Sequence, residues 1–167
     1  QLPERLQLNL KVYRAELSAA WQEARYGKLW EQGVEGIERY NQLNKVEPMA
    51  RALSELNAKT WFSGLRREQS GARAEVPLID TSDSNRVKLN PLADWTWGDV
   101  WHFIGLHKVA YNALHDQHFP SIGCAPCTRA ISQGEDFRAG RWWWEDEAAK
   151  ECGLHVAAIK TLEETTA

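Results

Sequence analysis

The sequence predicts an α/β fold with a largely parallel sheet and flanking helices. Three observations lead to this class. Short segments of strand type alternate along the chain with longer segments of helix type, which is the pattern of α/β proteins. One strand-type segment runs directly into a basic loop that contains glycine, and open α/β sheets hold ligands in such loops. The length of 167 residues, with 43% hydrophobic and 26% charged residues, suits one globular domain with its own core.

The first third of the chain is predicted to hold a strand followed by helices. Residues 6–14 alternate apolar and polar side chains, as half-buried strands do. Residues 17–44 are helical in composition but are interrupted by three glycines. Residues 45–57 place apolar side chains on one helical face, and Pro48 suits the first turn because a missing N–H costs nothing there.

The middle of the chain is predicted to supply the remaining strands and the clearest helix. Residues 60–65, 76–80 and 86–92 are strand candidates, and prolines make one of the last two an edge strand. Residues 96–108 form the helix, because Thr96 followed by an acidic residue three positions later resembles a capping box. The apolar stripe of this helix consists of Trp97, Val100, Trp101 and Ile104.

The last part of the chain is predicted to be rich in loops from 110 to 141 and to end in a helix over residues 144–152. We expect residues 1–156 to form a single domain and residues 157–167 to form a flexible tail. The chain opens on Gln1 rather than methionine, which indicates a processed or truncated chain.

Composition excludes several classes of protein. The net charge of −3 argues against a general nucleic-acid binder, which needs a basic surface. No apolar run approaches the roughly 20 residues of a membrane helix. A secreted disulfide scaffold needs more cysteines than three, and an even number of them. We therefore expect a reducing cytoplasm and interpret each thiol as a ligand, a nucleophile or a packing residue.

Two of the thiols form a Cys-x-x-Cys motif, "GCAPC", at Cys124 and Cys127. This spacing lets two sulfurs reach one metal ion or form one disulfide. A structural zinc or iron–sulfur centre needs about four ligands, and Cys152 is the one further thiol in the chain. His115 and His118 lie just upstream, although a lone histidine is more often a surface or packing residue.

Cationic side chains gather in the predicted loops. Any one arginine is more often a surface charge, but arginines at glycine-bearing turns after strands suit phosphate or sulfate, whose oxygens match the guanidinium fork. Because this chain has a net charge of −3 and yet carries several arginines in its predicted loops, it is predicted to bind a small polyanion. These arginines are Arg66, Arg67, Arg73, Arg129, Arg138 and Arg141.

The third thiol, Cys152, lies in "ECGLH" and could be structural or nucleophilic. A nucleophile must be a thiolate, and the C-terminal end of the predicted helix, together with Glu151, disfavours that negative charge. Lys150, His155 and the arginines of "FRAGR" could offset this effect. A cationic pocket would also reduce the repulsion between a thiolate and an anionic substrate.

Taken together, "NKVEPMARAL", "TWFSGLRREQSGAR", "GRWWWED" and "ECGLH" closely resemble the assimilatory sulfonucleotide reductases, over nearly the whole chain up to about residue 155. The resemblance implies an adenine-nucleotide-hydrolase-like α/β fold and a cytoplasmic oxidoreductase of sulfate assimilation. Such enzymes reduce phosphoadenylyl sulfate or adenylyl sulfate to sulfite with thioredoxin or glutaredoxin as the donor. The family fold begins with further strands and a phosphate loop, so we expect this chain to be its C-terminal two-thirds.

The resemblance also implies roles for particular residues. Cys152 is the nucleophile that attacks the substrate's sulfur and carries a thiosulfonate. No cofactor is required for this covalent step. The phosphate and sulfate contacts fall on Lys45, on the group Arg66, Arg67 and Arg73, on Arg138 and Arg141, and on His155.

The chain departs from the family pattern at the thiols. Cluster-bearing members carry adjacent cysteines before the K-V-E-P motif and a later Cys-x-x-Cys, and together these hold a [4Fe–4S] cluster. Tyr40 and Asn41 replace the first pair here, as in the cluster-free members that use the 3′-phosphorylated substrate, whereas Cys124 and Cys127 remain. Only two of four expected thiolates are thus present, which should not hold a cluster within one chain, while a [4Fe–4S] cluster shared between subunits stays open.

Two alternatives stay open beside the reductase. One is a non-catalytic module in which the thiols bind metal and the arginines bind a nucleotide. The other is an inactive fragment or chimera of such a reductase. A homo-oligomer is also left open, whereas nucleic acid and membrane partners are not expected.

Overall fold

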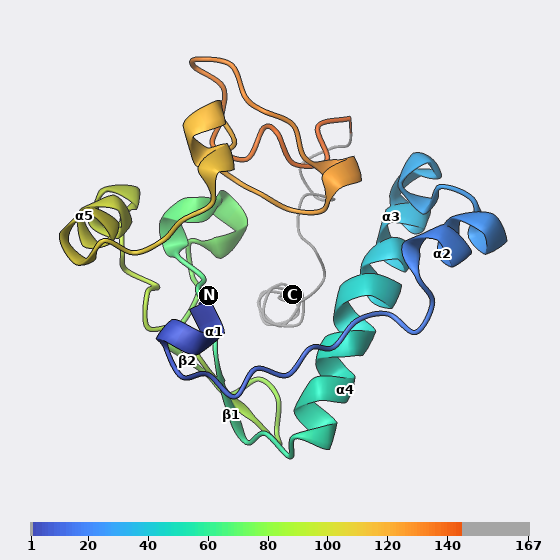
Figure 1. Cartoon of the computed structure of the whole chain (residues 1–167), viewed down its shortest axis with the longest axis horizontal. Coiled ribbons are helices and arrows are strands. Elements are labelled where there is room, and N and C mark those ends of the chain that lie inside the picture. Colours follow the sequence, from blue (N-terminus) through green and yellow to red (C-terminus); the bar gives the residue numbers. More distant parts are fainter. Residues whose placement is uncertain (1, 145–167) are drawn as a thin grey trace, which may run out of the picture.

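The computed structural model describes residues 2–144. Figure 1 shows two arms, one built from α2, α3 and α4 and the other from the sheet and α5, with the loops of residues 110–142 passing between their upper ends. The α-helices are α1 (Leu2–Arg5), α2 (Ala19–Tyr26), α3 (Gly33–Asn41), α4 (Glu47–Glu55) and α5 (Trp97–His107). A π-helical turn, η2 (Gln42–Val46), joins α3 to α4, so the three form one continuous rod. Short 3₁₀ helices are η1 (Leu29–Glu31), η3 (Arg67–Gln69), η4 (Gly71–Arg73), η5 (Ala113–Gln117) and η6 (Ala125–Cys127).

The sheet has three strands, β1 (Thr60–Phe62), β2 (Ile79–Asp80) and β3 (Val87–Leu89), in the order β1-β3-β2. β1 pairs with β3 in parallel, and β2 pairs with β3 antiparallel. The α/β class is therefore confirmed, and the described sheet is mixed rather than wholly parallel. β2, which follows Pro77, lies at an edge as predicted.

Helix α5 confirms the prediction made from its capping signal. The Thr96 hydroxyl accepts a hydrogen bond from the Asp99 N–H at 3.1 Å, and the Asp99 carboxylate accepts one from the Thr96 N–H at 2.8 Å. This reciprocal pair satisfies two backbone donors at the helix start. The predicted apolar stripe is the less exposed face of the helix, but its side chains are only half-buried.

The strand predicted over residues 6–14 is wrong. The segment is extended without forming a ladder, and its alternating side chains Leu8, Leu10 and Val12 are more than half exposed. A strand needs a neighbour to satisfy its backbone, and no described strand pairs with this segment.

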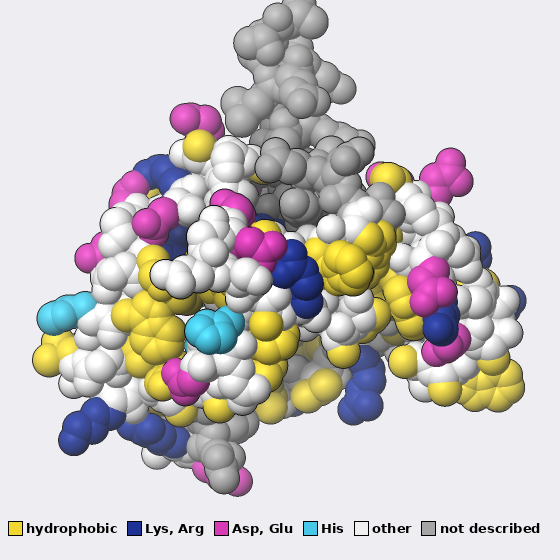
Figure 2. Space-filling model, turned by 90° about the horizontal axis from the view of Figure 1, so that it is seen from above, with side chains coloured by type: hydrophobic (Ala, Val, Ile, Leu, Met, Phe, Trp, Pro, Cys, Tyr) yellow, Lys and Arg dark blue, Asp and Glu magenta, His cyan; other side chains and the backbone are white. Residues whose placement is uncertain are grey.

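The best-packed part of the core joins helix α3 to the last part of the described chain. Ile37 of α3, Cys127 and Trp142 are almost completely buried against one another. On the face seen in Figure 2, hydrophobic side chains gather in several patches while acidic and basic side chains are interspersed. Among the described residues, no helix is long and apolar enough to cross a membrane.

Candidate active site

Two loop segments pair to form the frame of the candidate site. The Arg129 N–H donates to the Gly140 carbonyl at 3.0 Å, and the Trp142 N–H donates to the Cys127 carbonyl at 3.1 Å. This short antiparallel pairing places Trp142 beside Cys127. Gly140 permits it, because a Cβ there would lie 2.3 Å from the Arg129 carbonyl oxygen.

Cys124 and Cys127, called here the thiol pair, are free thiols held in one turn. The Cys127 N–H donates to the Cys124 carbonyl at 3.0 Å, and the Thr128 hydroxyl donates to the same oxygen at 2.9 Å. Cys127 is fully buried, whereas Cys124 is partly exposed. The pair thus has one accessible and one inaccessible sulfur.

The end of α3 and the π-helical turn η2 bring Tyr40 and Lys45 to the thiol pair, and Asn41 holds the Lys45 side chain. The Tyr40 hydroxyl is hydrogen-bonded to Cys124, and its ring packs edge-on against Trp142 with centroids 6.1 Å apart. Lys45 donates from Nζ to Asn41 Oδ1 at 2.8 Å, and Nζ also lies 5.8 Å from the centre of the Trp142 ring. Lys45, predicted to contact an anion, therefore lies at the thiol pair.

The two thiols differ in acidity because of their surroundings. A hydrogen bond from Cys127, then one from Tyr40 and the positive charges of Lys45 and Arg141, lower the pKa of Cys124 to about 5 against the opposing effect of burial. The hydrogen bond to Cys124, together with burial, raises the pKa of Cys127. Cys124 is therefore the more acidic thiol of the pair.

Arg141 is the cation nearest the buried sulfur. Its Nη2 lies 3.9 Å from Cys127 Sγ, the side chain is buried, and its Nε has no hydrogen-bond partner among the described residues. A buried guanidinium with an unsatisfied N–H is costly unless an anion or another acceptor binds it. Arg138 and Arg141 are the first and last residues of one turn, in which the Arg141 N–H donates to the Arg138 carbonyl at 2.8 Å. The Arg138 side chain is also buried.

Residues 66–73, called here the basic loop, follow β1 as predicted. Arg66 and Arg73 are both buried. Burial lowers the pKa of Arg66, the charge of Glu68 opposes this effect, and the positive charge of Arg73 adds to it. Arg66 Nη1 has no hydrogen-bond partner within the described chain and lies 3.8 Å from a Glu68 carboxylate oxygen. Arg67 differs, because its guanidinium pairs with Asp94 and donates to the Val76 carbonyl at 2.9 Å.

The described residues do not fit a four-iron cluster. They offer two thiols, and Tyr40 packs beside them. Within residues 2–144 no group of three or more His, Cys, Asp or Glu side chains could hold a metal ion. His115 and His118 instead line a separate cleft.

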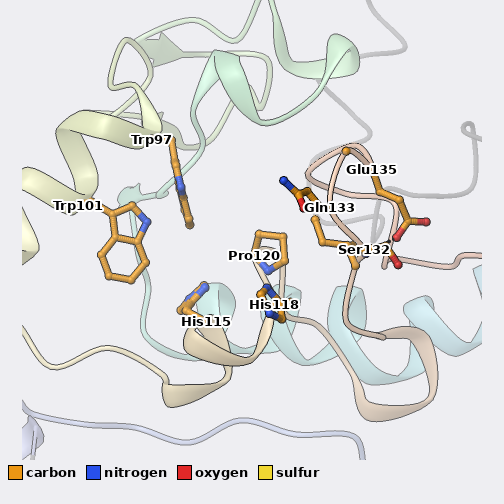
Figure 3. A pocket seen from close by; sticks show the side chains of 10 residues that line it. Trp97, Trp101, His115, His118, Pro120, Ser132, Gln133 and Glu135 are labelled. Carbon is orange, nitrogen blue, oxygen red and sulfur yellow. Dashed lines mark hydrogen bonds between the residues drawn. The ribbon is translucent and has the colours of Figure 1, made fainter.

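This cleft has a volume of about 690 Å³ and is rich in aromatic side chains. Figure 3 shows Trp97 and Trp101 reaching in from α5, opposite His115 and His118. The His115 ring lies 5.8 Å from the Trp101 ring. The tryptophans of the α5 stripe are only half-buried because they line this cleft.

Sequence reasoning missed how central Tyr40, Asn41 and Trp142 are to the site. It treated the first two as a missing ligand pair, whereas both now contact residues of the site directly. Three consecutive tryptophans signalled that one could be buried, and Trp142 is that residue, while Trp143 is exposed. Cys152, His155, the predicted tail and all but the first residue of the helix predicted over 144–152 lie outside the described residues.

Comparison with known proteins identifies relatives of one kind. A family model described as "Phosphoadenosine phosphosulfate reductase domain" matches residues 1–130. A curated protein named phosphoadenosine 5′-phosphosulfate reductase from Enterobacter sp. (strain 638) is 53% identical over 155 residues, covering 93% of this chain and 62% of that protein. The protein of that name from Vibrio parahaemolyticus is 54% identical over 156 residues, covering 93% and 58%.

A solved structure supports the same relationship. The crystal structure of phosphoadenylyl-sulfate reductase from Candida auris, in a phosphate complex, matches with a TM-score of 0.63 at 30% identity, over 78% of this chain and 61% of that one. The adenine-nucleotide-hydrolase-like fold is thereby confirmed. The chain spans about 62% of the length of the Enterobacter relative. The resemblance seen in its motifs is borne out: this chain belongs to the phosphoadenosine phosphosulfate reductase family.

Proposed function

We propose that this chain carries the catalytic cysteine and much of the anion site of a cytoplasmic reductase that converts phosphoadenylyl sulfate, or adenylyl sulfate, to sulfite. The observation that carries the proposal is the burial of two guanidinium groups that each have one nitrogen, Arg66 Nη1 and Arg141 Nε, without a hydrogen-bond partner in the described chain. Buried cations of this kind call for an anion, and a sulfonucleotide supplies phosphate and sulfate oxygens. The names of the relatives support the same substrate.

In the proposed reaction, the Cys152 thiolate attacks the sulfur of the sulfonucleotide. The bond between that sulfur and the phosphate oxygen breaks, and the adenosine phosphate leaves with the electron pair. A thiol of reduced thioredoxin or glutaredoxin then attacks the Cys152 sulfur, and sulfite leaves with the electrons of the S–S bond. A second thiol resolves the mixed disulfide, so the donor supplies two electrons.

We assign the anion contacts to a subset of the predicted cations. Lys45, Arg66, Arg73, Arg138 and Arg141 are buried or half-buried, whereas Arg67 already pairs with Asp94 and is better suited to holding the basic loop. His155 would contribute from the motif that contains the nucleophile. Tyr40 and Asn41 in place of a cysteine pair favour the 3′-phosphorylated substrate.

The test is capture of the sulfonate. Incubation with phosphoadenylyl sulfate and no thiol donor should add one sulfonate to Cys152, detected by peptide mass spectrometry, and reduced thioredoxin should then release sulfite. Adenosine 3′,5′-bisphosphate, which has no sulfonate, is the matched control. Cys152→Ser should lower sulfite release by at least about 10³-fold, since the nucleophile is lost.

Sulfite release by Cys152→Ser at the unsubstituted rate, or a sulfonate on another cysteine, would contradict the mechanism. The same assay on the chain extended by the N-terminal segment of a relative separates an incomplete active site from a wrong assignment. Capture by the extended chain alone would mean that the segment completes the site. Rates with adenylyl sulfate beside the phosphorylated substrate measure the preference.

A further inference from the structure

The thiol pair has no part in the proposed reaction and does not complete a metal site within the described residues. Two adjacent thiols that hold no metal can still exchange two electrons with a disulfide. We propose that Cys124 and Cys127 form a reversible dithiol–disulfide site, oxidised by low-molecular-weight disulfides of the glutathione class and reduced again by thiols of the same class. This inference does not depend on the proposed function.

The turn that holds the pair gives it the geometry of a disulfide. The Cys127 N–H bonds to the Cys124 carbonyl at 3.0 Å, and residues that close such a turn have Cα atoms less than about 7 Å apart. Disulfides span about 4.4–6.8 Å between Cα atoms. The Cys127 sulfur lies back over the turn, since it donates to the Cys124 carbonyl at 3.2 Å, and Pro126 fixes the backbone between the two residues. Bond formation therefore needs side-chain rotation and no refolding of the backbone.

The difference in exposure assigns an order to the steps. Cys124 is partly exposed and can attack a disulfide from solution, whereas Cys127 is fully buried and can react only with Cys124. Attack by the Cys124 thiolate on glutathione disulfide releases one glutathione thiolate and leaves a mixed disulfide. Cys127 then loses its proton and attacks the Cys124 sulfur, releasing the second glutathione. The pair gives up two electrons, and both glutathione thiols end reduced and protonated.

The neighbouring side chains favour this chemistry. The guanidinium of Arg141 lies 3.9 Å from the Cys127 sulfur, and Lys45 acts on Cys124 through its positive charge. Nearby cations stabilise a thiolate, which is the attacking species. The Tyr40 hydroxyl, hydrogen-bonded to Cys124, adds a neutral donor that can also stabilise the thiolate. One turn therefore holds an accessible nucleophile and a buried resolving thiol, and cationic side chains lie beside it.

The test counts thiols in the full chain carrying Cys152→Ser, so that the pair supplies every thiol. The protein is treated with EDTA, equilibrated in glutathione buffers of defined potential, quenched with acid, alkylated and weighed by mass spectrometry. We expect both thiols to disappear together without a glutathione adduct. The ratio of oxidised to reduced protein should change tenfold for about 30 mV, the constant for a two-electron couple.

Two variants in the same background serve as matched controls. Cys127→Ser should accumulate one glutathione on Cys124, because the resolving thiol is gone. Cys124→Ser should stay unmodified, because Cys127 is inaccessible in the folded chain. Far-UV circular dichroism checks that each variant is folded.

Three results would overturn the proposal. The first is that both thiols of the folded protein remain alkylatable in fully oxidised glutathione, and the second is that each thiol takes up its own glutathione. The third is that the thiols are protected from alkylation before EDTA treatment, and that EDTA exposes them while it releases stoichiometric zinc or iron. That result would identify a metal site instead.

Discussion

At the scale of single residues, a glycine sets the position of Arg141. A Cβ built on Gly123 would lie 2.2 Å from Arg141 Nη2 and 2.3 Å from its Cζ. The guanidinium therefore rests directly on the bare backbone of the loop that leads into the thiol pair. Side chains larger than hydrogen at position 123 compete with Arg141 for the same space.

Gly123→Ala should displace the Arg141 guanidinium from the thiol pair at a small cost in stability, about 1 kcal/mol, because the far end of a side chain can shift more easily than the backbone. Loss of this positive charge should raise the pKa of Cys124, measured from the pH dependence of thiolate absorbance in the Cys152→Ser background. Gly105→Ala, where a Cβ meets nothing within 4 Å, is the matched control. An unchanged pKa of Cys124 in folded Gly123→Ala would show that Arg141 does not act on the pair.

At the scale of elements, helix α5 could be predicted because its signals are local. Thr96 and Asp99 are three residues apart, so the sequence contains both partners of the cap. The strand over 6–14 could not be judged in this way, since a strand depends on a neighbour that the local pattern does not specify. The mixed pairing of the sheet has the same cause, because the direction of β2 depends on the loop between β2 and β3.

The pairing of β2 with β3 contains a buried ion pair between directly opposite residues. Asp80 faces Lys88 in the register, their charged atoms lie 3.5 Å apart, and the two side chains are 8% and 9% exposed. Burial works to raise the pKa of Asp80, but hydrogen bonds from Ser82 and Lys88, with the charge of Lys88, outweigh it and hold that pKa below its usual range. The carboxylate is thus charged in the folded protein at neutral pH.

Lys88→Met should lower the free energy of unfolding by about 3–5 kcal/mol, because it leaves a buried carboxylate without its partner. Urea denaturation at pH 7 measures this loss. Asp80→Asn combined with Lys88→Met should recover part of it, while Lys28→Met, which breaks the exposed pair with Glu31, should cost less than about 1 kcal/mol. A loss in Lys88→Met no larger than that in Lys28→Met would refute the role of the pair.

The sign of the pH dependence follows from the lowered pKa of Asp80. Its contribution to stability is fully present above the unfolded-state pKa of about 3.9 and is lost as pH falls through the lower folded-state pKa. The difference between the unsubstituted chain and Lys88→Met should therefore shrink as the pH falls below about 4.

At the scale of the whole molecule, the candidate site is assembled from distant parts of the chain. The sequence identified Lys45, Cys124, Cys127 and Arg141 one by one, from motifs and residue chemistry. It could not show that α3 and η2 meet the turn at η6, because this juxtaposition depends on the packing of the rod against the loops that follow α5. The same packing places Tyr40 beside the thiol pair and lets Asn41 hold Lys45, roles that their residue types did not suggest.

Trp142 is the side chain that holds these parts together. It is 0% exposed and packs against Ile37 and Cys127, while its ring faces Tyr40 edge-on and lies beneath the Lys45 ammonium. A residue near the end of the described chain thus joins the helical rod to the loop of the thiol pair. Its removal should loosen the whole site together, rather than one contact at a time.

Trp142→Ala should lower the free energy of unfolding by about 3–5 kcal/mol, the usual cost of truncating a buried aromatic side chain. Trp143→Ala, at the adjacent position where the side chain is 55% exposed, should cost less than about 1 kcal/mol. Urea denaturation followed by circular dichroism measures both. In the Cys152→Ser background, folded Trp142→Ala should also expose Cys127 to alkylation, whereas Trp143→Ala should leave it protected. Equal losses in the two variants, with Cys127 protected in both, would mean that the rod and the thiol pair are held together by other contacts.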